Sequence, residues 1–174
     1  MCEMGTPEPA LIEPTETLRR EFLSMAEEYA RAGDARYRPA LEDFTAYLRG
    51  ISDGARGIGL STGRVPYSTF WLASGRRLVG RSSIRHHLTP DLEDEGGHIG
   101  YDIRPAERRK GYGKLILRLT LAEAKKLGLH RALLTCDADN VASSKVIEAN
   151  GGRFQDQGVS KRSGKLISRF WIEL

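Results

Sequence analysis

The sequence predicts a mixed α/β fold, with helices and strands interleaved along one chain. Apolar periods of about 3.6 residues and of about 2 residues alternate. They give the order two helices, three strands, helix, strand, helix and two strands. A chain of 174 residues, 40% of them hydrophobic, can bury one core without disulfides or metals. No linker or composition shift divides it. We therefore expect one domain at residues 15–174, after a loose leader at residues 1–14.

The two N-terminal helices follow from apolar spacing. In residues 15–31, Leu18, Phe22, Met25 and Tyr29 recur at intervals of four, three and four, which places them on one helix face. A second helix is expected after Pro39, ending near Gly50. Residues 53–63 are rich in glycine and polar residues, so we expect a loop or a degenerate strand there.

The remaining elements alternate between strands and helices. Strands are expected at residues 67–73, 77–86 and 97–103, since apolar and polar residues alternate there. A helix with a wide apolar surface follows at residues 111–127 and ends at Gly128. A strand at 132–136, a helix at 141–149 and strands at 154–157 and 166–174 complete the chain.

Positive charge is concentrated in the middle of the sequence. The formal net charge is +4, and nine Lys or Arg residues stand against two acids between Arg104 and Arg131. Tyr112 is the one aromatic among the basic residues of the turn, so a nucleic-acid binder is the weakest interpretation. We find no apolar run long enough for a membrane helix and no signal peptide. The two cysteines predict reduced thiols, and we expect a cytoplasmic protein without membrane or nucleic-acid partners.

The turn at residues 108–114 carries the clearest chemical signal. Gly111 and Gly113 lie one residue apart behind three basic residues, between a strand and a helix. Glycine tolerates φ > 0 and has no Cβ, so backbone N–H groups of such a turn can approach a ligand closely. The start of the helix adds unpaired N–H donors and the positive end of its dipole. This pattern predicts a pyrophosphate ligand.

The spacing excludes two common phosphate-binding loops. A GxxxxGK[ST] loop needs Ser or Thr after its lysine, but Lys114 is followed by Leu115. A GxGxxG loop needs glycine at position 116, which is Ile116. What remains is (Arg/Gln)-x-x-Gly-x-(Gly/Ala), here starting at Arg108. An Asn-x-x-(Ser/Ala) helix beginning at Asn140 then precedes a glycine pair and Phe154.

Together, these motifs resemble the GNAT superfamily of acyl-CoA-dependent N-acetyltransferases. The resemblance covers roughly residues 66–174, and residues 98–105 are also similar to a bacterial subgroup of predicted acetyltransferases. It implies a GNAT-like mixed, mostly antiparallel central sheet flanked by helices. A splayed pair of parallel strands would hold the co-substrate acetyl-CoA.

The resemblance also implies a set of cofactor-binding residues. Backbone N–H groups of residues 109–114 would hold the CoA pyrophosphate, and the backbone of residues 102–104 would pair with the pantetheine arm. Asn140, with Ser143 or Ser144, would hydrogen-bond the pantetheine, although Asn140 is equally expected to cap its helix. The full set is Asp102, Ile103, Arg104, Arg108, Arg109, Lys110, Gly111, Tyr112, Gly113, Lys114, Asn140, Ser143 and Ser144.

The implied mechanism is direct attack of a neutral amine on the thioester, without a metal. A base must take a proton from an amine whose pKa is about 10.4 if it is lysine-like. Glu95 and His98 are the candidates, with a solvated acidic loop and a structural histidine as the alternative interpretations. A backbone N–H at a bulge in the strand 97–103 would stabilise the oxyanion.

The expected general acid is missing from its usual position. Many family members carry a tyrosine seven residues after the Asn140 position, where this chain has Ile147. Ser144 is our candidate, and Cys136, a water, Tyr101 and Tyr112 are alternatives. His86 and His87 predict no metal site, because adjacent strand residues face opposite sides.

We therefore expect an N-acetyltransferase that acts on a primary amine of a small molecule or peptide. A non-catalytic acyl-CoA-binding module is the alternative, because Ile147 replaces the usual acid. The acidic run at residues 91–95 suggests a cationic acceptor. The sequence leaves a homodimer open.

Overall fold

The computed structural model describes residues 7–174. Its strands form a four-stranded sheet in the order β1-β2-β3-β4 and a three-stranded sheet in the order β5-β7-β6, with every pair antiparallel. The strands are β1 (Ala10–Ile12), β2 (Tyr67–Ser74), β3 (Arg77–Arg85), β4 (Ile99–Ile103), β5 (Arg131–Asp137), β6 (Arg153–Val159) and β7 (Leu166–Glu173). The helices are α1 (Arg19–Arg31), α2 (Arg38–Glu42), α3 (Phe44–Ala55), α4 (Pro90–Asp94), α5 (Tyr112–Lys126) and α6 (Val141–Glu148), with 3-10 turns η1 (Glu16–Leu18) and η2 (Pro105–Glu107).

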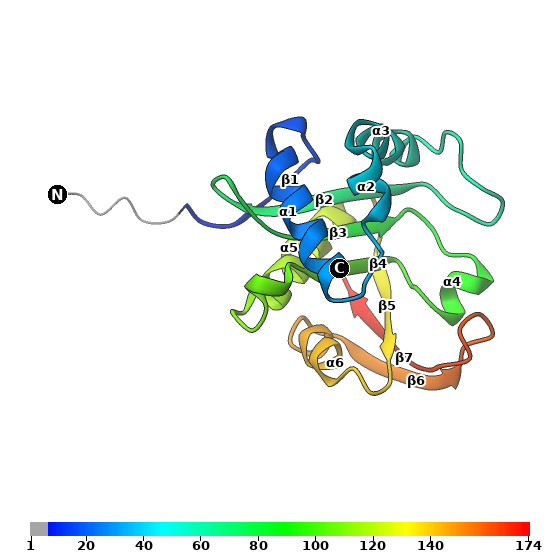
Figure 1. Cartoon of the computed structure of the whole chain (residues 1–174). Helices are drawn as coiled ribbons and strands as arrows, with labels where there is room; N and C mark the ends of the chain where they lie inside the picture. Colours follow the sequence, from blue (N-terminus) through cyan, green and yellow to red (C-terminus); the bar gives the residue numbers. More distant parts are fainter. Residues whose placement is uncertain (1–6) are drawn as a thin grey trace.

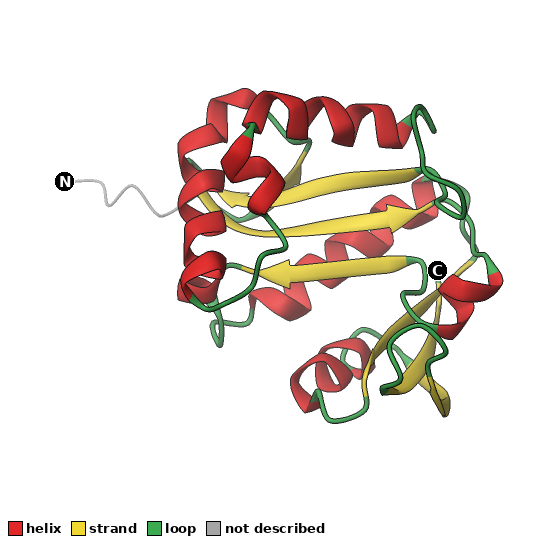
Figure 2. Cartoon of the chain, turned by 45° about the vertical axis from the view of Figure 1, so that its right-hand side comes forward, coloured by secondary structure: helices red, strands yellow, loops and turns green. Residues whose placement is uncertain are grey.

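Helices cover both faces of the four-stranded sheet (Figures 1 and 2). On one face, α1 to α3 pack through aromatic side chains, and the rings of Phe22 and Trp71 stack with centroids 4.7 Å apart. On the other face, α5 buries Ile116 and Leu117 against the sheet. The mixed α/β class predicted from the sequence is confirmed.

The two sheets meet at the start of β4 and separate beyond it. The backbone N–H of His98 donates to the carbonyl of Leu133 on β5 at 2.7 Å, and the Leu133 N–H donates to His98 Nδ1 at 2.9 Å. Past this junction β4 and β5 belong to different sheets, and Figure 2 shows them diverging. The splay expected from the resemblance is therefore present.

Several expected elements have different bounds. The single helix expected after Pro39 is two helices, because Asp43 leaves the helical conformation and its carboxylate caps α3 by accepting from the Ala46 N–H at 2.9 Å. Helix α3 then continues to Ala55, into the segment expected to be a loop. The expected strand at residues 97–103 begins at Ile99, and its bulge is absent, since Ile99–Ile103 pair one to one with β3.

Two elements were not expected. Strand β1 lies inside the segment expected to be a loose leader, and its residues pair with Trp71, Leu72 and Ala73 of β2. Residues 1–6 of that leader lie outside the described residues. Helix α4 occupies most of the acidic run at residues 91–95, where Thr89 caps it and Pro90 stands at its first turn.

Candidate functional site

The turn between β4 and α5 presents a row of free backbone donors. Arg109 has a φ of 62° and Gly111 a φ of 86°. In the described part of the chain, the N–H groups of residues 109–113 have no hydrogen-bond acceptor. Left-handed residues in such a turn aim successive N–H groups into one concavity, which suits an anion. The N-terminus of α5 adds its dipole to the same place.

Some of the basic side chains on this turn are paired with other groups of the protein, and others are free to bind a ligand. Lys110 Nζ lies 2.9 Å from Glu107 Oε2, so its charge is paired. Arg108 donates from Nε to the Ile103 carbonyl at 3.2 Å and lies over the Tyr29 ring. Arg109 and Lys114 are exposed and have no carboxylate within 4 Å among residues 7–174. The turn therefore keeps positive charge free for a ligand.

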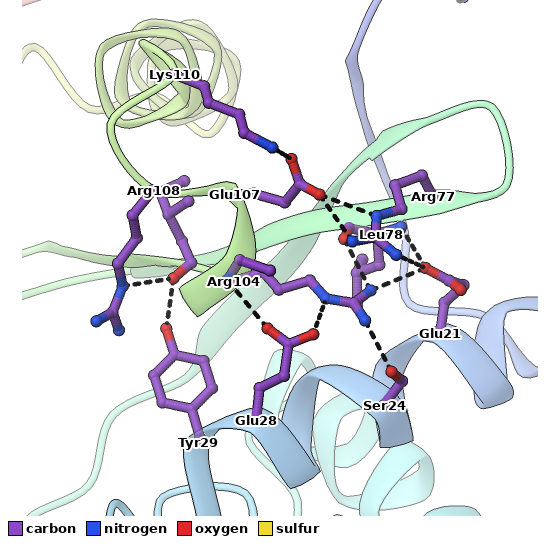
Figure 3. A network of polar contacts seen from close by, with 12 residues as sticks. Glu21, Ser24, Glu28, Tyr29, Arg77, Leu78, Arg104, Glu107, Arg108 and Lys110 are labelled. Atoms are coloured by element: carbon purple, nitrogen blue, oxygen red, sulfur yellow. Dashed lines mark hydrogen bonds and ion pairs between the residues drawn. The ribbon is translucent and has the colours of Figure 1, made fainter. Parts of the chain in front are cut away.

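A buried polar network anchors the turn to α1 (Figure 3). The Arg104 side chain is 3% exposed, and its Nε lies 2.7 Å from Glu28 and its Nη1 2.9 Å from Glu21. Ser24 accepts a third bond from Arg104 at 2.7 Å. Glu107 joins the network by pairing with Arg77 at 2.8 Å. These contacts fix the chain on the β4 side of the glycine turn.

A cavity of about 430 Å³ lies beside the turn, and we call it the turn cavity. Its walls come from the turn, β4, α1 and α6. Most of the sequence-predicted cofactor residues line it: Asp102, Ile103, Arg108, Arg109, Gly111, Tyr112, Gly113, Lys114, Asn140 and Ser143. Arg104, Lys110 and Ser144 are not among its lining residues, and the side chains of the first two are held by acids.

A second cavity, of about 340 Å³, continues from the first between β4 and β5. This splay cleft is lined by Glu95, Gly100, Cys136 and Ile147, among others, and shares Tyr101, Asn140 and Ser143 with the turn cavity. The Asn140 Oδ1 accepts from the Ser143 N–H at 3.1 Å and caps α6. The cap leaves the Asn140 amide NH₂ free to donate.

The direction of the β4 backbone decides which of its groups face the splay. The Arg104 N–H donates to Val79 of β3 at 2.8 Å. Because backbone groups alternate along an antiparallel strand, those of Asp102 also point to β3, and those of Tyr101 and Ile103 point to the opposite edge. The Ile103 carbonyl accepts there from the Tyr29 hydroxyl at 2.8 Å. Of the three residues predicted to pair with an extended ligand, only Ile103 presents its backbone to the splay.

Two hydroxyls meet where the cavities join. The Tyr101 Oη and Ser143 Oγ lie 3.1 Å apart, and burial raises the pKa of Tyr101 to about 12. Both hydroxyls are therefore protonated across the neutral range. Ser144 instead contacts the Sγ of Cys136 at 3.4 Å. Ile147 is buried in the wall of the splay cleft, so an apolar group occupies the position of the usual acid.

Glu95 lies in the splay cleft but is a weak base. Its Oε2 accepts from the Ser160 hydroxyl at 2.6 Å, and its Oε1 lies 3.2 Å from Arg162. The hydrogen bond from Ser160, with further help from Arg162, lowers the pKa of Glu95 to about 2. A carboxylate with that pKa binds a cation better than it holds a proton.

His98 holds the two sheets together rather than facing the cleft. It is buried, does not line the splay cleft, and its Nδ1 accepts the Leu133 N–H. Burial, together with the positive charges of Arg131 and Arg85, lowers the pKa of His98. The ring is therefore neutral, with its acceptor nitrogen already used, which favours a structural role.

A third cavity, of about 540 Å³, adjoins the splay cleft and shares Arg85 and Arg162 with it. This arginine pocket is lined by Arg64, Arg81, Arg85 and Arg162 against one acid, Asp91. The acidic run at residues 91–95 had suggested a cationic acceptor. In the folded chain, Asp94 pairs with Arg169 and Glu95 pairs with Arg162. The side chains that line the pocket are therefore mostly positive.

Sequence reasoning missed the residues that long-range packing brings to the site. Tyr29 and Arg36 of the α1 region line the turn cavity, and Arg85 and Arg162 border the splay cleft. For Tyr29, the sequence predicted only a place on the apolar face of a helix. Residues 7–174 contain no group of three or more His, Cys, Asp or Glu side chains placed to hold a metal. No helix among them is long and apolar enough to cross a membrane.

Comparison with known proteins gives a family and a fold. A family model described as an acetyltransferase (GNAT) domain matches residues 11–153. No curated protein matches the sequence. A Salmonella typhimurium acetyltransferase that modifies the N-terminal serine of ribosomal protein L7/L12 is 12% identical, with a TM-score of 0.70 over 98% of this chain and 96% of that one.

Two further solved structures share the fold. Mycobacterium smegmatis RimJ, in complex with CoA-disulfide, is 17% identical, with a TM-score of 0.71 over 95% of this chain and 81% of that one. YncA of Salmonella typhimurium, with its cofactor acetyl-CoA, is 16% identical, with a TM-score of 0.64 over 95% and 94%. At these identities the likeness concerns the fold alone.

Proposed function

Because this chain belongs to the GNAT acetyltransferase domain family, we propose that it moves an acetyl group from acetyl-CoA to a primary amine. The family makes it a transferase enzyme. The co-substrate, the residues that bind it and the acceptor are the parts we propose. The observation that carries the proposal is the row of free N–H donors at residues 109–113, which opens onto the turn cavity.

The three cavities suggest how the substrates are arranged. The pyrophosphate of CoA would bind the turn, where free N–H groups and the α5 dipole favour an anion. The pantetheine arm would then run along the exposed edge of β4, where Ile103 and Tyr101 present their backbone groups. The thioester would lie in the splay cleft, and the acceptor would enter from the arginine pocket. Solved structures of the same fold contain CoA or acetyl-CoA.

The chemistry follows from the groups around the splay cleft. A neutral amine attacks the thioester carbonyl, the C–N bond forms, and the C–S bond breaks to release the CoA thiolate. Glu95, ionised at neutral pH, would hold the incoming ammonium by charge, while water carries its proton away because a carboxylate of pKa about 2 is a poor acceptor. We assign neither His98 nor Ser144 a step, since neither lines this cleft.

The departing thiolate needs a hydrogen-bond donor. The hydroxyl pair of Tyr101 and Ser143 lines both the turn cavity and the splay cleft, and both members are protonated at neutral pH. We assign them to this role in place of the tyrosine that Ile147 replaces. A hydrogen bond to a charged acceptor contributes about 1.5–3 kcal/mol, so removing one should slow the reaction more than it weakens CoA binding.

The alternative, a non-catalytic acyl-CoA-binding module, rests on the same turn and on Ile147. Release of free CoA thiol by the purified protein, with acetyl-CoA and a panel of primary amines, separates the two. We expect amine-dependent thiol release and an acetylated product by mass spectrometry. Acetyl-CoA binding without release across the panel would support the binding module instead.

A further inference from the structure

The arginine pocket contains more positive charge than the protein neutralises. Among residues 7–174, no carboxylate lies within 4 Å of the guanidinium groups of Arg64, Arg81 or Arg85, although eleven other Lys or Arg residues do form such pairs. We propose that the acceptor amine carries an anionic group, a carboxylate or a phosphate, which these three arginines bind. This inference rests on the proposed function in one respect, namely that the arginine pocket is where the acceptor binds.

Arg81 gives the strongest sign of a missing partner. It lies on β3, its Nε is buried without any hydrogen-bond partner, and the one hydrogen bond that its side chain makes among residues 7–174 is a long one of 3.5 Å, from Nη2 to Thr69. Asp102 is its register partner on β4, but the carboxylate there accepts instead from the Tyr37 hydroxyl at 2.7 Å. An unpaired charge in a partly buried position is unfavourable unless a ligand supplies the counter-charge.

Among the residues that the structure describes, Arg85 is a second arginine without a carboxylate partner, and it borders the splay cleft as well as the arginine pocket. Its Nη1 donates to the carbonyls of Gly96 and Gly97, both at 2.9 Å, which fixes the guanidinium without neutralising it. Burial lowers the pKa of Arg85, and the nearby charges of Arg162, Arg64 and Arg81 lower it further. Like charges have therefore been gathered at this site, and a bound anion would relieve their repulsion.

The position of the pocket sets where the anion and the amine lie. Arg85 and Arg162 border both the arginine pocket and the splay cleft. An acceptor with its anionic group among the arginines would extend its amine past Arg85 toward Glu95. The pocket volume of about 540 Å³ suits a small molecule or the first residues of a peptide.

The acids near the pocket do not oppose this arrangement. Asp91 is exposed at the rim, where solvent screens its charge. Glu95 is already paired with Arg162 at 3.2 Å. The carboxylate of Asp102 accepts hydrogen bonds from Tyr29 and Tyr37. None of these carboxylates lies within 4 Å of the guanidinium groups of Arg64, Arg81 or Arg85, although Tyr37, Tyr47 and Asp102 together raise the pKa of Arg81 against the lowering effect of burial.

Matched amine pairs test the proposal. Each pair shares an amine and differs in one anionic group: phosphoethanolamine against ethanolamine, glycine against glycinamide, and a peptide with Asp against Asn at its second residue. We expect kcat/KM to be at least about 30-fold higher for the anionic member of one pair, as for a buried charge contact. The pair that responds distinguishes phosphate, a free carboxylate and an acidic peptide.

Two arginine variants and one control connect that preference to the pocket. Arg81→Met keeps the length of the apolar stem, and Arg64→Gln lies on an exposed loop, so the test survives if Arg81→Met fails to fold. Both should lower kcat/KM for the anionic member by a larger factor than for the neutral one. Arg76→Gln, on the exposed β2–β3 turn and outside the pocket, should change neither. Arg81→Met should also keep or raise Tm without ligand, since it removes an unpaired charge.

The outcomes separate this inference from the proposed function. Equal turnover of charged and neutral amines would overturn the anionic acceptor and leave acetyl transfer intact. If no amine is acetylated, the proposed function fails. The Tm measured with the same compounds then decides whether the arginine pocket binds an anion. A Tm rise with the anionic members in wild type, absent in Arg64→Gln, would still support an anion site. No Tm rise with any of them would overturn it.

Discussion

The backbone conformation at Arg109 and Gly111 is the smallest feature on which the proposed donor site depends. Arg109 has a φ of 62°, and no other non-glycine residue in the described part of the chain has a positive φ. A left-handed residue of this kind costs roughly 1–3 kcal/mol and tends to occur at functional sites. Here it lies in a turn that faces the turn cavity and leaves its N–H groups free. The strain is therefore consistent with a ligand-binding role.

Gly111→Val tests that role, with Gly128→Val as a matched control. The two glycines have φ values of 86° and 87°, and an added Cβ meets nothing within 4 Å at either. Both variants should lose about 1–2 kcal/mol of stability through left-handed strain. Only Gly111→Val should weaken acetyl-CoA binding, by about tenfold or more, since a charge-assisted hydrogen bond is worth that much.

Calorimetric titration and thermal unfolding of both variants give the two quantities. Equal acetyl-CoA affinity in both folded variants would show that the turn does not hold the cofactor.

Glu95 predicts a pH dependence of stability. Its folded-state pKa of about 2 lies below the ordinary value of 4.5, because Ser160 and Arg162 favour the carboxylate. A depressed pKa stabilises the fold at pH values above the unfolded pKa and loses that contribution as pH falls through the folded one. The Tm difference between wild type and Glu95→Gln should therefore be constant from pH 7 to about 5 and shrink between about 4.5 and 2.

Thermal unfolding at a series of pH values measures this difference. Glu148→Gln serves as the control, since Glu148 is exposed on α6 and has no ion-pair partner among residues 7–174. A difference that grows toward low pH would mean that Glu95 is not held as a carboxylate.

At the scale of elements, Arg104 connects the segment between β4 and α5 to helix α1. Its guanidinium joins two turns of α1 to the residue that follows β4, and the Ala106 N–H donates to the same Glu28 at 3.1 Å. The glycine turn begins only a few residues later. Helix α1, far away in the sequence, therefore holds the segment that leads into the proposed donor site.

Arg104→Ala should be strongly destabilising. Removing one partner of a buried ion pair leaves an uncompensated charge and costs about 3–5 kcal/mol. Arg118→Ala, on the exposed face of α5, should change the free energy of unfolding by less than about 0.5 kcal/mol. Denaturant unfolding measures both. A loss below about 1 kcal/mol for Arg104→Ala would show that the network does not anchor the turn.

The elements also show what the sequence could predict. The strands after Pro66, α5 and the capped helix α6 follow from local patterns, and the structure confirms them. The break at Asp43 was missed because a single capping residue interrupts an otherwise continuous helical pattern. Strand β1 was missed because three residues carry too little periodicity, and it forms only by pairing with β2.

The candidate site divides in the same way. The glycine turn could be located from sequence because its chemistry lies within seven consecutive residues. The positive charge of the arginine pocket could not be predicted, because Arg64, Arg81, Arg85 and Arg162 come from separate segments. The acidic run beside them does not show these pairings in the sequence, since folding brings Asp94 and Glu95 to arginines far along the chain.

At the scale of the whole molecule, the site arises where two antiparallel sheets part. The His98 and Leu133 contacts join them at one point, and the splay cleft opens beyond it. The turn cavity adjoins this cleft through Tyr101, Asn140 and Ser143, and the arginine pocket adjoins it through Arg85 and Arg162. Two cavities therefore adjoin one cleft, and the proposed function assigns one to the acyl donor and the other to the acceptor.

Amide hydrogen exchange with and without acetyl-CoA tests this arrangement most directly. We predict protection at residues 109–113 and at Tyr101 and Ile103, whose N–H groups face the proposed ligand, and unchanged exchange at residues 62–65 of the arginine pocket. Unchanged exchange at residues 109–113 under saturating acetyl-CoA, or protection confined to residues 62–65, would contradict the account.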